Sequence, residues 1–473
     1  MKQTAFLLIL VINGFLTFSA IGKDRPNIIL VMSDDQGWGQ TGYNHHPILK
    51  TPNLDKMAES GIRFNRFYAG APVCSPTRAS VLTGRSNDRT GVYAHGYAMC
   101  TQEKTLAQAL QQAGYKTAHF GKWHLNGLRG PGVPILKSDK RNPGQLGFDE
   151  WLSVTNFFDI DPIMSHNGEF VEIKGESSHI VVDEALRFIE KEKDNGKPLF
   201  VVIWFGSPHA PWRAEEKDRK IFEVLDEKAQ NHYGELVNID QSIGDLRKGL
   251  RSMNLEENTL VWFNSDNGGL PNFGPETVGG LRGYKGQIYE GGLRVPCIIE
   301  WPAVIKQSRI TDFPASTMDI FPTIADILGL PKSAMVQPVD GSSIKKLFTV
   351  DVEKREKPIP FRYQGKGALV DNNYKLVATD ISKNNFELYD LGKDPNETKN
   401  IIDGESGVAK QMIKIFLKWS NSVDNSDAGK DYPNGFSEPN GYNVSWVTLP
   451  EYKPYFPQWK NRPEYKEILK TEN

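Results

Sequence analysis

Residues 27–37 read Asn-Ile-Ile-Leu-Val-Met-Ser-Asp-Asp-Gln-Gly. The continuous apolar run at residues 27–32 is typical of a strand that is buried on both faces of a sheet. The run is followed by two adjacent carboxylates, Asp34 and Asp35, and functional residues of open α/β sheets gather at the carboxyl ends of strands. This stretch therefore predicts a central strand. Two adjacent carboxylates at its end would repel unless a cation or an arginine holds them, and taken alone they are more often an exposed acidic turn than a site.

The N-terminal three quarters of the chain alternate between such runs and helical patterns. Further strands are predicted at residues 115–120, 199–205, 259–264 and 296–300. Helices are predicted at residues 51–61, 103–113, 178–191 and 227–253. This alternation predicts an α/β fold with a mostly parallel central sheet sandwiched by helices.

The pattern changes after about residue 357. Short alternating runs at residues 368–370, 374–377 and 386–389 predict a small antiparallel sheet, and a helix is predicted near residues 408–420. The tail from residue 431 is too rich in aromatic residues for a disordered segment, so we expect it to pack back on the body. These aromatic residues include Trp446, Tyr452, Tyr455, Phe456 and Trp459.

The first 22 residues have the pattern of an export signal. Lys2 precedes an apolar centre at residues 6–16, and Ala20-Ile21-Gly22 offers small residues for cleavage. The apolar run is short for a membrane span. We therefore predict a signal peptide at residues 1–22, a main domain at 23–356 and a C-terminal subdomain at 357–473. The mature protein would be periplasmic or secreted and would have no membrane span.

Overall charge and cysteine content exclude other classes. The formal net charge of −2 gives no indication of a nucleic-acid partner. Three cysteines, Cys74, Cys100 and Cys297, are too few for a disulfide scaffold. Cys100 and Cys297 could pair, which would leave Cys74 single, but the spacing does not show it.

Cys74 begins the segment Cys-Ser-Pro-Thr-Arg, where a helix is expected to start. Pro76 suits a first helical turn, and Arg78 lies four residues after the cysteine on the same helical face. A cysteine beside a guanidinium at a helix N-terminus is in an electropositive environment. The alternative is an inert buried cysteine, since free cysteine is among the most buried residue types.

Residues 74–78 and the following Leu82-Thr-Gly-Arg85 resemble the signature of the type I sulfatases, of the alkaline-phosphatase-like superfamily. Thr77 stands where the family usually has serine, and both carry a hydroxyl. The resemblance is to secreted bacterial polysaccharide sulfatases. It implies that Cys74 is converted to 3-oxoalanine (formylglycine), whose hydrate is the nucleophile. It also implies a partner for that conversion, a formylglycine-generating or anaerobic sulfatase-maturating enzyme.

A second strand end reads Ser265-Asp266-Asn267-Gly-Gly. Alone it is an ordinary turn, but with Asp34 and Asp35 it supplies four hard oxygen donors. Such donors suit Ca²⁺ or Mg²⁺ rather than zinc, and composition does not separate the two. The resemblance implies Ca²⁺, with the modified Cys74 as a further ligand.

Three basic segments also match the family in order. Residues 121–124 read Gly-Lys-Trp-His, residues 208–211 read Pro-His-Ala-Pro, and residues 283–286 read Gly-Tyr-Lys-Gly. Singly, such residues are more often ordinary surface groups. Together they imply a catalytic set of Cys74, Arg78, Lys122, His124, His209 and Lys285.

The resemblance also implies roles for this set. The divalent cation and the basic side chains would neutralise the sulfate ester. His209, with Lys285, would protonate the leaving alcohol, a role suited to a near-neutral pKa. His124 would take a proton from the second hydroxyl of residue 74 so that sulfate is expelled.

A secreted sulfatase most often meets sulfated carbohydrate. We expect an algal polysaccharide such as ulvan or carrageenan, or its oligosaccharides, with glycosaminoglycan as the next choice. The aromatic tail could line the cleft. Candidate substrate-binding residues are Trp212, Arg213, His166 and Arg282, with Arg129 and Arg294 as further candidates. Each also has a plain alternative, because aromatic residues usually lie in the core and surface arginines usually bind water.

Three rival functions remain. The first is a phosphomonoester or phosphonate hydrolase of the same superfamily, although nine histidines and no evident second-metal cluster favour one hard cation. The second is an inactive carbohydrate-binding relative, which predicts loss of catalytic residues that this chain retains. The third is a thiol hydrolase that uses Cys74 directly, which the carboxylate cluster disfavours.

Overall fold

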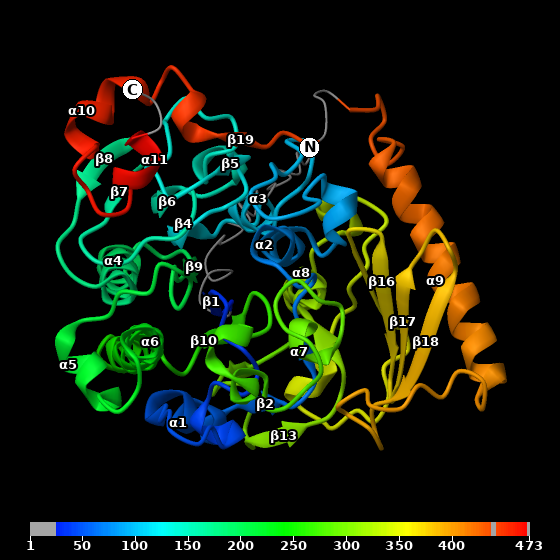
Figure 1. Ribbon diagram of the computed structural model, residues 1–473. Coiled ribbons are helices and arrows are strands. Elements are labelled where there is room, and N and C mark those ends of the chain that lie inside the picture. The colour runs from blue at the N-terminus through cyan, green and yellow to red at the C-terminus, as the bar shows by residue number, and fades with distance from the viewer. Residues whose placement is uncertain (1–24, 437–440, 471–473) are drawn as a thin grey trace, which may run out of the picture.

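The centre of the molecule is a ten-stranded sheet (Figure 1) in a computed structural model that describes residues 25–436 and 441–470. The predicted signal peptide lies outside these residues. Five neighbouring strands are parallel: β10 (Thr259–Ser265), β1 (Asn27–Ser33), β9 (Leu199–Trp204), β4 (Lys116–Lys122) and β6 (Glu150–Val154). The prediction of a mostly parallel sheet is confirmed.

Shorter strands extend both edges of the sheet. Beyond β10 lie β12 (Cys297–Glu300), β2 (Ile62–Phe64) and β13 (Arg309–Thr311). Beyond β6 lie β7 (Ile163–His166) and β8 (Glu169–Glu172). Because β12 and β7 run antiparallel to their inner neighbours, the continuous parallel part of the sheet is its middle, where both faces are covered. At one edge, β13 again pairs in parallel with β2.

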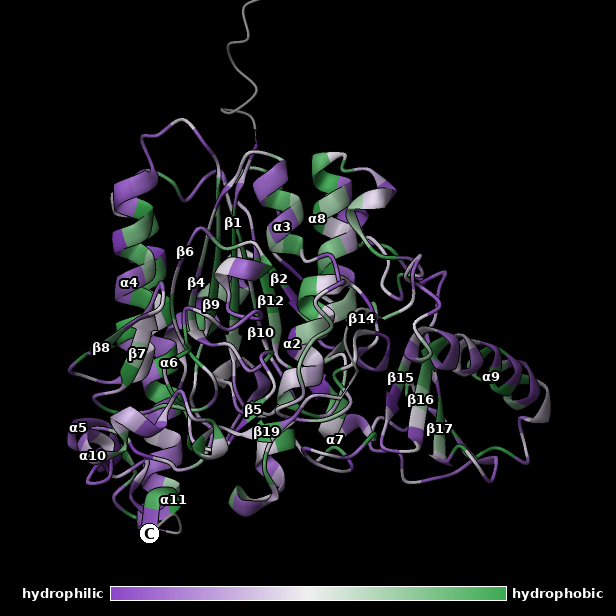
Figure 2. Cartoon of the chain, turned by 90° about the horizontal axis from the view of Figure 1, so that it is seen from above, coloured by the Kyte–Doolittle hydropathy of each residue, from purple (hydrophilic) through white to green (hydrophobic). Residues whose placement is uncertain are grey.

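Helices cover both faces of this sheet (Figure 2). Side chains of β1 alternate between two cores, Ile28 and Leu30 on one face and Ile29 and Val31 on the other. The first core is closed by α2 (Cys74–Thr83), α3 (Leu106–Gln112) and α8 (Ile320–Leu328). The second is closed by α1 (Pro52–Ser60), α4 (Ser177–Glu192) and α6 (Glu227–Ser252). The sandwich predicted from the alternating pattern is therefore present.

Strand register brings the ends of the parallel strands to one edge. Ser33 pairs with Ser265, so that Asp34 and Asp266 leave the sheet side by side. Gly121 pairs with Trp204 on the neighbouring strand, and a Cβ at Gly121 would lie 1.9 Å from the Trp204 carbonyl oxygen. Glycine is therefore required just before Lys122.

A second sheet of four antiparallel strands follows: β15 (Ile359–Tyr363), β16 (Lys366–Asp371), β17 (Tyr374–Asp380) and β18 (Asn385–Asp390). The runs predicted as strands form β16, β17 and β18, whereas β15 was not predicted. The outer face of this sheet packs against α9 (Ser406–Asp427) (Figure 1), and its inner face packs on Tyr68, Val73 and Met318 of the main body.

The aromatic tail packs back on the body, as predicted. Its strand β19 (Val444–Ser445) pairs in parallel with β5 (Leu128–Arg129). The tail's buried aromatic residues pack on Leu128 and Val133 of the main domain; they are Trp446, Tyr452, Trp459 and Tyr465. The tail, which we grouped with the C-terminal subdomain, thus packs on the main domain rather than on the small sheet.

The described residues contain neither a candidate membrane span nor a disulfide. No helix among them is both long enough and apolar enough to cross a bilayer. Cys100 and Cys297 are free and buried, as is Cys74, so the possible Cys100–Cys297 disulfide is absent from this structure.

A buried lysine joins the small sheet to the main body. Lys375 of β17 lies 3.0 Å from carboxylate oxygens of both Glu290 and Glu397, and all three side chains are fully buried. Glu290 belongs to α7 (Glu290–Leu293), and its other oxygen accepts a hydrogen bond from the Tyr68 hydroxyl. Lys375 thus bridges two buried carboxylates at the junction of the two sheets, and Arg294 Nη1 lies 3.8 Å from the second oxygen of Glu290.

Replacing this lysine tests its contribution. Lys375→Met should lower the free energy of unfolding by about 3–5 kcal/mol, because it removes the buried cation that lies 3.0 Å from both Glu290 and Glu397. Urea unfolding followed by tryptophan fluorescence measures the change. Lys383→Met removes an exposed lysine from the turn after the same strand and serves as the control. Equal shifts for the two variants would contradict the role of the buried cluster.

The same cluster predicts a pH dependence. Burial raises the pKa of Glu397 to about 7, although Lys375 opposes the shift. The folded state therefore binds this proton more tightly than the unfolded chain, and stability falls as pH rises from about 4.5 to 7, by on the order of 3 kcal/mol. Glu397→Gln should reduce the decrease of the urea midpoint between about pH 4.5 and pH 7. Glu59→Gln, an exposed change, should leave the slope as in the wild type.

Candidate active site

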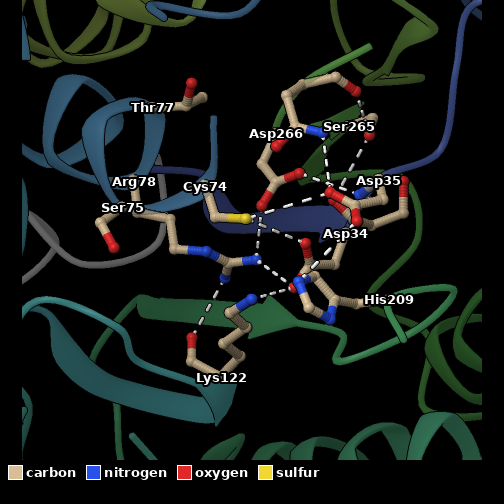
Figure 3. A network of polar contacts seen from close by, with 12 residues as sticks. Asp34, Asp35, Cys74, Ser75, Thr77, Arg78, Lys122, His209, Ser265 and Asp266 are labelled. Carbon is tan, nitrogen blue, oxygen red and sulfur yellow. Dashed lines mark hydrogen bonds and ion pairs between the residues drawn. The ribbon is translucent and has the colours of Figure 1, made fainter. Parts of the chain in front are cut away.

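Helix α2 begins at Cys74, and all ten of its residues are buried. The Cys74 Sγ atom lies 3.4 Å from Asp34 Oδ1 and 4.0 Å from Asp35 Oδ1 (Figure 3). Thr77 fixes the preceding loop, since its hydroxyl donates to the Ala71 carbonyl at 2.8 Å and accepts from the Ala71 amide at 3.2 Å. A serine hydroxyl could make the same two bonds, so Thr77 preserves the motif's geometry.

The two predicted acidic strand ends meet beside this cysteine. The Asp35 amide donates to Asp266 Oδ1 at 3.1 Å, and Asn267 Nδ2 donates to Asp35 Oδ1 at 2.8 Å. Asp35 has a φ of 65°, in the left-handed region that non-glycine residues rarely adopt. Such strain persists only where surrounding contacts impose it, and here it turns the Asp35 carboxylate toward the cluster.

Each carboxylate of the cluster is paired with a cation, and Figure 3 shows the pairs made by Arg78 and Lys122. Arg78 Nη2 donates to Asp266 Oδ2 at 2.8 Å and Lys122 Nζ donates to Asp34 Oδ2. Lys285 Nζ lies 2.6 Å from Asp35 Oδ1 and 2.7 Å from its Oδ2. Burial raises the pKa of Asp34, but Lys122, His209, Arg78 and Lys285 outweigh it and hold that pKa well below its usual value.

Two histidines complete the predicted set. His209 Nε2 lies 3.8 Å from Asp35 Oδ2, Nδ1 donates to the Ala210 carbonyl at 2.6 Å, and the ring stacks on Phe157. His124 is buried at a φ of 57°, and neither ring nitrogen has a hydrogen-bond partner in the described structure. Both histidines line the same cavity as Cys74.

The pKa of one of these groups, His209, differs from the value expected from the sequence. Burial and the charge of Lys285 lower the pKa of His209 to about 4, so the near-neutral value expected for this residue is not found. Burial, with the charge of Asp34, raises the pKa of the Cys74 thiol well above its ordinary range. A buried protonated thiol is a poor nucleophile, which argues against a thiol hydrolase.

The donor set fits a hard divalent cation. Single ligand atoms of Asp34, Asp35, Cys74 and His209 lie within 4.8 Å of one another. Asn267 Oδ1 is buried without a hydrogen-bond partner, a costly arrangement that a bound cation would relieve. The oxygen-rich set suits Ca²⁺ or Mg²⁺. His209 enters this group although it was not predicted as a ligand.

A cavity of about 640 Å³ opens over the cluster, a volume typical of small-ligand sites. Four of the predicted catalytic residues line it: Cys74, His124, His209 and Lys285. The other two, Arg78 and Lys122, lie fully buried beneath it. The structure therefore brings the six predicted catalytic residues and the predicted metal ligands together at one end of the sheet.

Most predicted substrate-binding residues do not line this cavity. Trp212 packs edge-on against Phe273, Arg282 donates to the Tyr389 hydroxyl, and His166 lies 3.7 Å from Glu150. Arg213 lines a separate, small cavity, and Arg294 lies over the Trp38 ring. These side chains are used by local packing and ion pairing.

The aromatic tail also differs from expectation. Its aromatic side chains form the buried cluster described above, and among the tail residues that the structure describes only Ser445 lines the cavity. The cavity walls that the sequence did not predict are His95, Gly130, Pro131, Asn156, Phe157 and Ser445. Asn156 and Phe157 follow the end of β6, so recognising that strand would have indicated them. Ser445 depends on the β5–β19 pairing, for which the sequence gives no local signal.

The α/β fold, the oxygen-rich donor set and the surrounding basic side chains fit a hydrolase of anionic esters whose site could hold a hard cation. A model of the Sulfatase family matches residues 26–330, and a model of the N-sulphoglucosamine sulphohydrolase C-terminal region matches residues 283–421. The chain belongs to the sulfatase family and is a sulfuric ester hydrolase.

Individual relatives of the chain are also named sulfatases. The chain is 32% identical over 393 residues to N-acetylgalactosamine-6-sulfatase of Mus musculus, covering 76% of this chain and 72% of that protein. It is 29% identical over 346 residues to the ulvan-active sulfatase of Formosa agariphila, covering 68% and 65%. The crystal structure of Ps i-CgsB with k-i-k-neocarrahexaose matches with a TM-score of 0.75 at 23% identity, covering 94% of this chain and all of that one. The predicted sulfatase fold is confirmed.

Metal binding predicts a change in stability that does not depend on activity. Calcium at 100 times its dissociation constant should add about 2.7 kcal/mol to the free energy of unfolding. Thermal unfolding in EDTA and in CaCl₂ measures this, with MgCl₂ in parallel. Asn267→Leu removes the unpartnered oxygen and should reduce the shift, whereas the exposed Asn195→Leu should retain it. Identical midpoints of the wild type in EDTA and in both salts would exclude the cation.

Proposed function

We propose that this chain removes sulfate from a carbohydrate after Cys74 has been converted to formylglycine. The observation that carries the proposal is the contact of Cys74 with the Asp34–Asp35 cluster, inside a ring of basic side chains. Relatives named for N-acetylgalactosamine 6-sulfate and ulvan support a carbohydrate substrate. We favour an algal polysaccharide such as ulvan or carrageenan, or its oligosaccharides.

Burial of Cys74 bears on how it is modified. Its side chain is 1% exposed at the start of a wholly buried helix. A formylglycine-generating or anaerobic sulfatase-maturating enzyme would therefore act on the chain before it folds. When formed, the hydrated aldehyde supplies an oxygen nucleophile with a second hydroxyl that drives sulfate release.

The basic residues account for binding and orientation. Arg78, Lys122 and Lys285 would attract the anionic sulfate group and stabilise the charge that develops on it during attack. Preorganised donors of this kind are effective because their ion pairs already fix them in place. The cation would be held by Asp34, Asp35, Asp266 and Asn267. It would supply further positive charge next to the oxygens of the bound sulfate group.

Two positions are assigned to proton transfer. His209 Nε2 lies 3.8 Å and Lys285 Nζ 2.6 Å from carboxylate oxygens of Asp35. We assign to this pair the protonation of the leaving alcohol oxygen. His124, with unpartnered ring nitrogens in the cavity lining, is assigned to the hydroxyl proton of residue 74. In the first step the pair would give a proton to the leaving alcohol, and in the second His124 would take the hydroxyl proton, so both transfers would use groups within the cavity rather than bulk water.

The proposal includes the organisation of the whole chain. Residues 1–22 would be an export signal, so that the mature protein acts in the periplasm or outside the cell. Residues 23–356 would form the catalytic domain and residues 357–473 the C-terminal subdomain. The inner face of the small sheet packs on Val73, directly before the nucleophile, which supports a structural role for this subdomain.

The decisive experiment uses protein co-expressed with a maturation enzyme. Mass analysis of the peptide around Cys74 should show loss of sulfur and gain of the aldehyde. The protein should hydrolyse aryl sulfate in preference to aryl phosphate. Cys74→Ala should reduce kcat/KM by at least about 10³-fold, as removal of a nucleophile does elsewhere. Cys100→Ala, another buried cysteine, is the matched control. A preference for phosphate, or full activity of Cys74→Ala, would refute the proposal.

A further inference from the structure

One cation in the cavity wall has no role in the site described above. Arg129, the last residue of β5, lines the same cavity as Cys74 and Lys285. Its side chain is exposed, and its guanidinium makes neither a hydrogen bond nor an ion pair within residues 25–436 and 441–470. The other arginine in this region, Arg78, is by contrast fully buried and paired.

Arg129 adds a positive charge to the cavity wall that no carboxylate among the lining residues balances. Beneath the cavity, three carboxylates are matched by Arg78, Lys122 and Lys285. Among the residues that line the cavity itself there is no carboxylate. The neighbouring His95 reflects this field, because burial, and then Lys285, Lys122 and Arg129, lower its pKa. Arg129 is therefore an exposed cation, unpaired among the described residues, in the lining of a cavity that is suited to an anionic ligand.

Arg129 is held in place by three segments of the chain. Its backbone pairs with Ser445 of the tail strand β19. A Cβ at Gly96 would lie 3.3 Å from Arg129 Cβ, and the Gly96 amide donates to Ser75 Oγ at 2.8 Å. Since Ser75 follows Cys74, these contacts set the distance between the nucleophile and the arginine. The backbone of Arg129 thus has a fixed place relative to the reacting atom.

The remaining walls fit a sugar ring. Phe157 stacks on the His209 ring with centroids 5.0 Å apart, and Pro131 adds a second apolar surface. Asn156 Nδ2 donates to the Gly130 carbonyl at 2.7 Å, and Trp446 Nε1 of the tail donates to the Pro131 carbonyl at 3.0 Å. The loop after Arg129 is therefore held from both sides, by the end of β6 and by the tail.

We propose that Arg129 binds a second anionic group of the substrate, on the sulfated sugar or its neighbour. The inference rests on the proposed function and specifies the substrate class as doubly anionic. Arginine has five N–H donors and no acceptor, and it pairs bidentately with oxyanions more strongly than with hydroxyl groups. A carboxylate of a uronic acid and a second sulfate share this chemistry, and the experiment separates them.

The test compares Arg129→Gln with the wild type on four substrates. Two carry a second anion: a monosulfated disaccharide that contains a uronate, and a disulfated disaccharide without one. Two carry a single sulfate: a neutral monosulfated disaccharide and 4-methylumbelliferyl sulfate. Arg187→Gln, which removes an exposed arginine of α4, is the matched control, and Arg129→Lys keeps the charge without the fork.

We expect Arg129→Gln to raise KM about tenfold, equivalent to about 1.4 kcal/mol, on one doubly anionic substrate, with kcat little changed. The substrate affected identifies the anion. Activity on the two singly charged substrates and the thermal midpoint should stay as in the wild type, and Arg129→Lys should recover part of the loss.

Other results would overturn the inference. Equal losses on all four substrates would show a general effect on the sulfate site, and no loss on any would show that Arg129 does not bind substrate. Wild-type protein that acts only on singly charged sugars would likewise exclude the subsite. If matured wild type released sulfate from none of the four, the proposed function itself would fail, and the subsite with it.

Discussion

The structure depends on the mutual neutralisation of three carboxylates and three cations in a desolvated position. A buried charge without a partner costs several kcal/mol, so no member of this set is stable there alone. Parallel strand register makes the arrangement possible, because Asp34 and Asp266 leave neighbouring strands at the same level. Arg78 approaches from helix α2 and Lys122 from the end of β4, so the charges also fix the helix against the sheet.

The smaller sheet restrains the chain segment that precedes Cys74. Its inner face packs on Val73, and the Gly286 amide donates to the Pro72 carbonyl at 2.8 Å. The residues directly before Cys74 are therefore held by the loop that carries Lys285 and by the second sheet. A side chain at the first residue of a helix has no preceding turn to fix it, and these contacts supply that restraint for Cys74. The buried Lys375 then ties the second sheet to the same body.

Sequence reasoning succeeded where the determinant was local. The apolar run before Asp34 and the helix start at Cys74 each follow from neighbouring residues, and strand ends then converge by the geometry of a parallel sheet. It failed where the determinant was distant. The lowered pKa of His209 arises from burial and from Lys285, and the place of Ser445 arises from pairing with β5. Trp212 resembled a sugar platform, yet its ring packs edge-on against Phe273 and His232.

The two parts of the site therefore differ in what a substitution costs. Removing one partner from the buried cluster leaves a desolvated charge and destabilises the fold, so this part is tied to sulfate chemistry and stability together. Arg129 has an exposed side chain, and only its backbone is fixed by β19. Changing that side chain alters the charge at the cavity mouth without removing a buried contact. On the proposed function, substrate choice would depend on the cavity wall that the tail supports, and sulfate release on the residues at the strand ends.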